Sequence, residues 1–95
     1  MATKKTATRK KTSPNTFIRT VTSYYTGEVI EENETEIVLV KAAWIADTGR
    51  FAQAMATGDF SEVEPYPDTH QVCVARSSVI DRVRNWPHPL PRVQK

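Results

Sequence analysis

The chain has few of the residues on which many enzymes and metalloproteins depend. It contains one cysteine, two histidines and three glycines in 95 residues. A single cysteine forms no intrachain disulfide and no cysteine-based metal cluster. The glycines match neither the Gly-x-Gly-x-x-Gly pattern nor a P-loop, so the sequence shows no phosphate-binding loop of a known kind.

Groupings that support catalysis are also missing. His70 follows a proline-containing loop, His88 lies between two prolines, and neither has metal-ligand spacing to the other or to Cys73. Catalysis needs a nucleophile with a base, paired carboxylates in a cleft, or a metal. We therefore predict that the protein is not an enzyme and uses no cofactor and no metal. Cys73 lies in the apolar run 71–75 and is predicted to be a small buried hydrophobe.

Long hydrophobic runs are absent as well. No stretch approaches the ~20 apolar residues of a membrane-spanning helix. The first 16 residues lack the apolar region of a secretory signal, so we expect an intracellular protein with no membrane partner. A chain of 95 residues forms one domain at most, and its stability margin is small. Assembly into an oligomer would increase that margin.

Acidic residues are missing from one part of the chain. The sequence has 13 basic and 11 acidic residues; residues 1–16 hold five of the basic ones and none of the acidic ones, which leaves eight basic against eleven acidic in the rest. The five are Lys4, Lys5, Arg9, Lys10 and Lys11. Residues 1–16 have little to bury, so we predict a flexible basic arm. Such arms contact nucleic-acid phosphates or an acidic protein surface, or serve only as a solubilising tail.

The body of the chain has the composition of a small β domain. Residues 17–25, 28–31 and 35–45 are rich in β-branched and aromatic residues and predict a three-strand meander. A short helix is expected at about 48–57, a proline-containing loop at 61–69, and two further strands at 71–75 and 79–84. The predicted fold is mainly β, either a small five-stranded SH3-like barrel or a twisted antiparallel sheet with one short inserted helix. Its domain spans residues 17–86, and residues 87–95 form a proline-rich C-terminal tail, so both ends extend from the body.

Several side chains are candidates for an interface. The aromatic and basic candidates are Tyr24, Tyr25, Trp44, Arg82, Arg84 and Trp86. Arginines interleaved with aromatics are typical of weak nucleic-acid surfaces, and Arg76 with Arg82 and Arg84 offers a set of phosphate ligands. The five glutamates between residues 28 and 36 are interpreted as a solvated acidic strip, or else as the receptor for a basic patch such as a neighbour's arm.

The body resembles a known group of proteins at several short motifs. These are residues 18–20, 25–27, 36–39, 42–44, 49–51 and 56–58, followed by the strand, short turn and strand of residues 72–83. Over residues 17–84 the chain is similar to a family of short proteins encoded by tailed bacteriophages and their prophages. The resemblance implies a phage origin and a compact β fold, and it carries over no activity. The basic arm and the proline-rich tail lie outside it.

Three functions are compatible with these features. The first is a phage structural or assembly protein, such as a minor capsid, decoration or connector component that contacts other phage proteins and copies of itself. The second is a phage accessory protein that blocks a host defence system by binding a protein or a signalling nucleotide. The third is nonspecific DNA binding through residues 1–13. The expected location is the virion or the host cytoplasm.

Overall fold

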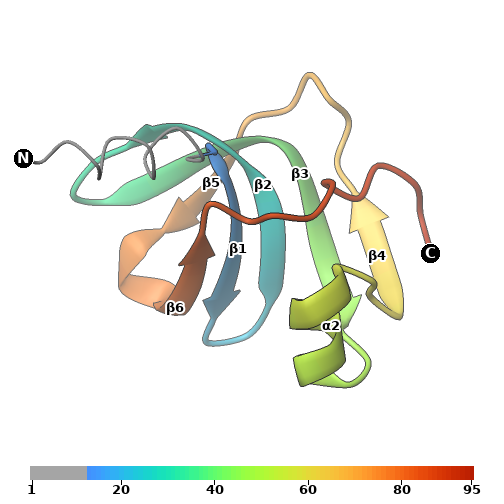
Figure 1. Ribbon diagram of the computed structural model, residues 1–95. Helices are drawn as coiled ribbons and strands as arrows, with labels where there is room; N and C mark the ends of the chain where they lie inside the picture. The colour runs from blue at the N-terminus through green and yellow to red at the C-terminus, as the bar shows by residue number, and fades with distance from the viewer. Residues whose placement is uncertain (1–12) are drawn as a thin grey trace, which may run out of the picture.

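Hydrogen-bonded strands make up about half of the described chain. The computed structural model describes residues 13–95. The six strands are β1 (Asn15–Thr20), β2 (Tyr24–Glu32), β3 (Glu36–Asp47), β4 (Glu62–Pro65), β5 (Val72–Ala75) and β6 (Val79–Arg84). A short helix, α2 (Phe51–Thr57), follows β3, and the 3-10 turn η1 (Arg76–Ser78) joins β5 to β6 (Figure 1). The prediction of a mainly β domain with one short helix is confirmed.

The strands form one open antiparallel sheet. Their order is β4-β3-β2-β1-β6, and β5 pairs with β3 beside the main path. The first part of β3 pairs with β5 and its second part with β4, so β3 lies at the centre of the sheet. The described chain therefore has six strands rather than the predicted five, and its sheet is open rather than closed into a barrel.

The additional strand is β4, which lies in a segment that its prolines predict to be a loop. Pro65 is the last residue of β4, and the strand pairs with β3 on one side only. On the other side, the Val63 N–H donates to the Lys95 carbonyl at 2.9 Å and the Lys95 N–H donates to the Val63 carbonyl at 3.0 Å. A proline at the end of such a strand interrupts no ladder, and this explains why the loop prediction was wrong.

The first turn of the meander also differs from expectation. The sequence predicts one strand over residues 17–25 with a bend at 26–27, whereas the chain turns at residues 21–23. There the Ser23 N–H donates to the Thr20 hydroxyl at 2.9 Å. Gly27 instead lies within β2, at a shift in the β2–β3 register. A Cβ at this glycine would lie 3.0 Å from the Leu39 Cβ, so the close approach of β3 favours glycine.

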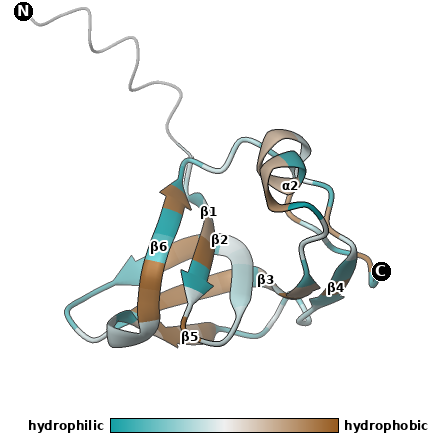
Figure 2. Ribbon diagram, turned by 90° about the horizontal axis from the view of Figure 1, so that it is seen from below, coloured by the Kyte–Doolittle hydropathy of each residue, from teal (hydrophilic) through white to brown (hydrophobic). Residues whose placement is uncertain are grey.

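Two apolar clusters occupy opposite faces of the sheet. Neighbouring residues of β1 divide between them, since Phe17 belongs to one cluster and Ile18 to the other. The first, here called the helix-side core, consists of Phe17, Ala43, Ile45, Ala54, Phe60, Val63 and Trp86. The second, the inner core, consists of Ile18, Ile37, Leu39, Ala42 and Val74. Helix α2 covers part of the sheet, and the strands carry most of the apolar residues (Figure 2).

The C-terminal segment, residues 86–95, packs against the body. Figure 1 shows it crossing the sheet from β6 toward β4. Trp86 is only 2% exposed, and Leu90 packs against the helix-side core. The Arg92 guanidinium donates to the Ala42 carbonyl at 3.1 Å and to the Tyr66 carbonyl at 2.7 Å. The expectation of an extended C-terminal arm is therefore wrong, because its aromatic and basic side chains find partners along its length.

Cys73 differs from its predicted environment. Its neighbour Val74 is buried in the inner core, whereas Cys73 is exposed. Strand β5 pairs only with β3 and is covered on one face only. Alternation along the strand places Val74 on the covered face and Cys73 on the open one.

Candidate functional site

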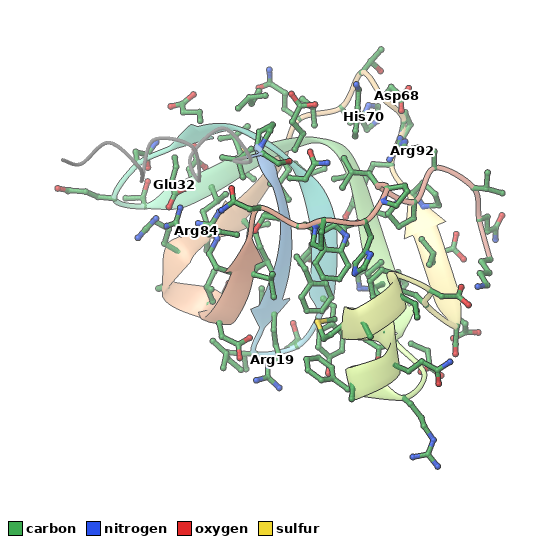
Figure 3. The ribbon with its side chains drawn as sticks, viewed as in Figure 1. Arg19, Glu32, Asp68, His70, Arg84 and Arg92 are labelled. Atoms are coloured by element: carbon green, nitrogen blue, oxygen red, sulfur yellow. The ribbon has the colours of Figure 1, made fainter. Side chains whose placement is uncertain are left out.

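Three arginines converge on one carboxylate at the end of β2. The Glu32 Oε2 atom accepts a hydrogen bond from Arg82 Nη1 at 3.0 Å and another from Arg76, and it lies 3.7 Å from Arg84 Nη2. Arg76 belongs to η1, and Arg82 and Arg84 belong to β6. We call these four residues the arginine cluster (Figure 3 labels Glu32 and Arg84). The cluster carries three positive charges and one negative charge.

The curl of the sheet brings these residues together. Strands β2 and β6 are not neighbours, because β1 lies between them. Arg82 pairs with Ile18 of β1, and Glu32 pairs with Ile37 of β3. Ile18 and Ile37 both belong to the inner core, so Arg82 and Glu32 lie on the same inner face. Arg82 Nε also lies 3.4 Å from the Thr16 hydroxyl, which itself donates to the Val83 carbonyl at 2.9 Å.

The cluster has more positive charge than its own acid can balance. Elsewhere in residues 13–95 each ion pair joins one cation to its own carboxylate: Arg19 to Asp81, Lys41 to Glu28, Arg92 to Asp68 and Lys95 to Asp59. Three cations share Glu32. A guanidinium has five N–H donors, so most donors of the cluster remain available to a second anion.

The arginines also keep Glu32 ionised. Partial burial raises the pKa of Glu32. Hydrogen bonds from Arg82 and Arg76 and the charges of Arg82 and Arg84 together lower it by a larger amount, so the pKa lies below the ordinary 4.5. Folding thus depresses this pKa. The resulting stabilisation is fully present above the unfolded-state pKa and is lost as the pH falls through the folded-state value.

A substitution at Glu32 tests this linkage. We expect Glu32→Gln to lower the free energy of unfolding at neutral pH, and the difference from wild type to disappear in acid, where wild-type Glu32 is also protonated. Urea denaturation at neutral pH and at a series of pH values well below 4.5 measures both effects. The control is Glu34→Gln, since Glu34 is exposed and forms no ion pair within residues 13–95. If Glu32→Gln lowers the free energy of unfolding by the same amount at every pH, the charge of Glu32 does not contribute to stability.

Two pockets flank the arginine cluster. The first has a volume of about 310 Å³, and its lining residues are Ser13, Pro14, Asn15, Val29, Glu32, Arg82, Arg84 and Asn85. The second has a volume of about 210 Å³, and its lining residues are Ile37, Arg76, Val79, Arg82 and Arg84. Arg82 and Arg84 line both. A pocket of about 380 Å³ beside α2 is lined by Arg50 and by the paired Asp59 and Lys95, and its two cations come from separate segments rather than sharing one carboxylate.

The first described residues of the chain form one wall of the larger flanking pocket, here called the arm-root pocket. The Ser13 N–H donates to the Asn85 side-chain oxygen at 3.0 Å, and the Val29 N–H donates to the Pro14 carbonyl at 2.9 Å. Asn85 has a φ of 55°, a left-handed conformation that asparagine tolerates better than most residues. These contacts place the start of the described chain directly beside Arg84.

The structure separates the residues predicted for an interface. Arg82 and Arg84 lie in the arginine cluster, whereas Trp86 is buried and Tyr24 packs against the helix-side core. Tyr25 packs against the inner core, and it pairs across the strands with Trp44, which is 40% exposed. The predicted arm contacts are Lys4, Lys5, Arg9, Lys10 and Lys11, and all five lie outside the described residues.

Glu32 is the site residue that sequence reasoning missed. The sequence groups it with Glu28, Glu31, Glu34 and Glu36 in a strip that is either solvated or the receptor for a basic patch, and it does not single out Glu32 as the partner of the arginines. The register of β2 and β3 shifts between Val29 and Glu31, so Glu32, rather than Glu31, follows Val29 on the inner face. A bulge of this kind has no signal in the glutamate-rich sequence.

Comparisons with known proteins add no relative. The chain matches no protein-family model, no curated protein and no solved structure. The resemblance to tailed-phage proteins therefore stays a prediction. Within residues 13–95, no three His, Cys, Asp or Glu side chains are grouped so that they could hold a metal ion. In the same part of the chain, no helix has the length and apolar character needed to cross a membrane.

Proposed function

We propose that the protein is a non-catalytic attachment module that binds the phosphate groups of nucleic acid. The observation that carries this proposal is the arginine cluster, in which three guanidiniums share one carboxylate beside a pocket. Arginine is well suited to phosphate, because its planar donors pair with two phosphate oxygens at once. Preformed ion pairs with Glu32 also restrict the arginine side chains before a ligand arrives.

The position of the cluster supports the same proposal. Ser13 is fixed beside Arg84 and Asn85, and Lys11 precedes it by only two residues in the sequence. The basic arm therefore joins the body next to the cluster, and its five charges add to those of the three arginines. Phosphate contacts of this kind give binding that depends strongly on salt and little on sequence.

We further propose that the sheet is an SH3-like barrel left half open. The path β6-β1-β2-β3-β5 is supported by the observed pairing, and η1 connects its two end strands. The ion pair between Glu32 and Arg82 links β2 to β6 over the intervening strand β1. In this arrangement the arginine cluster lies beside η1, the turn that joins the two end strands.

Deletion of residues 1–12 tests the contribution of the arm. Fluorescence anisotropy with a short labelled single strand measures the affinity over a range of salt concentrations. We expect the deletion to make the slope of log affinity against log salt shallower by up to about 3.5, because each phosphate contact on a single strand contributes about 0.7. Weaker binding through the body should remain. A wild-type protein that binds no nucleic acid at low salt would overturn the proposed function.

A further inference from the structure

The arm-root pocket combines two chemical features that a bare phosphate site does not need. One wall carries Arg82 and Arg84, and the same pocket contains the carboxylate of Glu32. Its volume of about 310 Å³ is at the lower end for small-molecule sites. Pro14 and Val29 add apolar surface. The pocket therefore suits a ligand that is partly anionic, partly apolar and able to donate a hydrogen bond.

Arg84 is the residue most available to a phosphate. Its side chain is 65% exposed, and its guanidinium makes no hydrogen bond to any residue between 13 and 95, since the 3.7 Å separation from Glu32 is too long for one. Arg82 is only 13% exposed and is held by Glu32 and Thr16. Arg82 thus fixes the inner wall of the pocket, while Arg84 keeps its donors free.

Glu32, which lines the same pocket, also has an unused acceptor. The three arginines all approach its Oε2 atom, and no residue between 13 and 95 donates a hydrogen bond to Oε1. An ionised carboxylate only accepts hydrogen bonds, so Oε1 repels a phosphate oxygen but attracts a hydroxyl. A ligand that places a hydroxyl close to its phosphate satisfies both groups. In nucleic acids, the 2′-hydroxyl of ribose meets this requirement, and it is the group that distinguishes RNA from DNA.

We infer that the arm-root pocket is a subsite for a ribonucleotide, whose phosphate binds Arg84 and whose ribose hydroxyl donates to Oε1 of Glu32. This inference rests on the proposed function and narrows its ligand from nucleic acid in general to ribonucleotides. The ribonucleotide comes from an RNA chain or from a free nucleotide. Both sources present the same chemistry, and the experiment distinguishes them.

The first test uses the wild-type protein and two ligands that differ in one group. Oligouridylate and oligodeoxyuridylate of equal length differ only in the 2′-hydroxyl. We expect the RNA strand to bind about tenfold more tightly at the same salt concentration, which is the ratio given by one hydrogen bond to a charged group. Competition with uridine 5′-monophosphate and its 2′-deoxy analogue then identifies the source. If the free ribonucleotide displaces the RNA strand and the deoxy analogue does not, the ligand is a free nucleotide. If neither displaces it, the ligand is an RNA chain.

A second test uses variants of the acceptor. Glu32→Leu removes both carboxylate oxygens with little change in size, and we expect the RNA-to-DNA affinity ratio to fall to about one. Glu31→Leu is the matched control, because it removes the same charge from the neighbouring residue, whose side chain lies on the other face of β2. The ratio is measured within each variant, so a smaller folded fraction affects both strands equally.

The outcomes separate this inference from the proposed function. An RNA preference that is lost in Glu32→Leu and kept in Glu31→Leu supports the ribonucleotide subsite. Equal binding of the two strands by wild type, or an unchanged ratio in Glu32→Leu, overturns the subsite and leaves phosphate binding intact. Absence of binding to either strand overturns the proposed function itself.

Discussion

Replacing Trp86 with alanine is expected to destabilise the protein by about 3–5 kcal/mol, as is typical when a large buried aromatic side chain is removed. Trp86 is 2% exposed and lies among stacked rings, with centroids 5.4 Å from Phe17 and 6.1 Å from Phe60. His88 meets it edge-on at 4.8 Å. The substitution leaves a cavity between the sheet and the C-terminal segment. A loss of this size is a large share of the about 5–15 kcal/mol that stabilises a typical domain.

Urea denaturation followed by circular dichroism measures this loss, and Trp44→Ala is the matched control. Trp44 is 40% exposed, so the same change there should cost much less. We expect Trp86→Phe to lower the free energy of unfolding by less than Trp86→Ala does. It keeps the ring stacking and removes an indole N–H that has no partner within the described residues. Equal losses at Trp44 and Trp86 would contradict the placement of Trp86 in the core.

Replacing Arg76, Arg82 and Arg84 together with glutamine is expected to remove the phosphate contacts of the body. The slope of log affinity against log salt for a single strand should become shallower by up to about 2, because the variant removes at most three contacts at about 0.7 each. The arm keeps its five basic residues in this variant. The remaining binding should therefore resemble that of a flexible basic peptide, with strong salt dependence and no preference between RNA and DNA.

A second triple variant separates a specific cluster from net charge. Arg19→Gln, Arg50→Gln and Lys95→Gln together remove the same three positive charges from other parts of the body. None of these residues lines the two pockets beside the cluster, and Figure 3 shows Arg19 at the other end of the sheet from Glu32 and Arg84. We expect a clearly smaller change in slope. Equal changes in slope in both triple variants would mean that the three arginines act only through the net charge of the protein.

Local patterns in the sequence were sufficient for the main elements of the fold. The apolar run of residues 35–45 predicted the central strand, and Gly58 predicted the end of the helix. Gly58 has a φ of 76°, and its N–H donates to the Ala54 carbonyl at 2.7 Å. Features that depend on contacts between distant segments were not predictable. The segment Trp86–Pro91 has the composition of a free polyproline-like tail, but Trp86 stacks against both Phe17 and Phe60, which also stack on each other.

In the candidate site, too, local features were predictable and contacts between distant segments were not. The sequence offers Arg76, Arg82 and Arg84 together as a set of phosphate ligands, with Arg82 and Arg84 on a predicted strand. Their common partner was not identified, because strict alternation along β2 places Glu31 rather than Glu32 on the face of Val29. One bulge reverses that assignment. The approach of β2 to β6 depends on the curl of the whole sheet, and no local pattern encodes it.

The most direct test of the arginine cluster as a phosphate site is an NMR titration of the isotope-labelled full chain with short oligouridylate. The account predicts that the largest changes occur in the side-chain N–H signals of Arg82 and Arg84 and in the signals of Ser13, Glu32 and Asn85, which line the arm-root pocket. Inorganic phosphate should move the same arginine signals in the same direction, with smaller amplitude. Changes confined to residues 1–12, or concentrated around α2, would contradict the account.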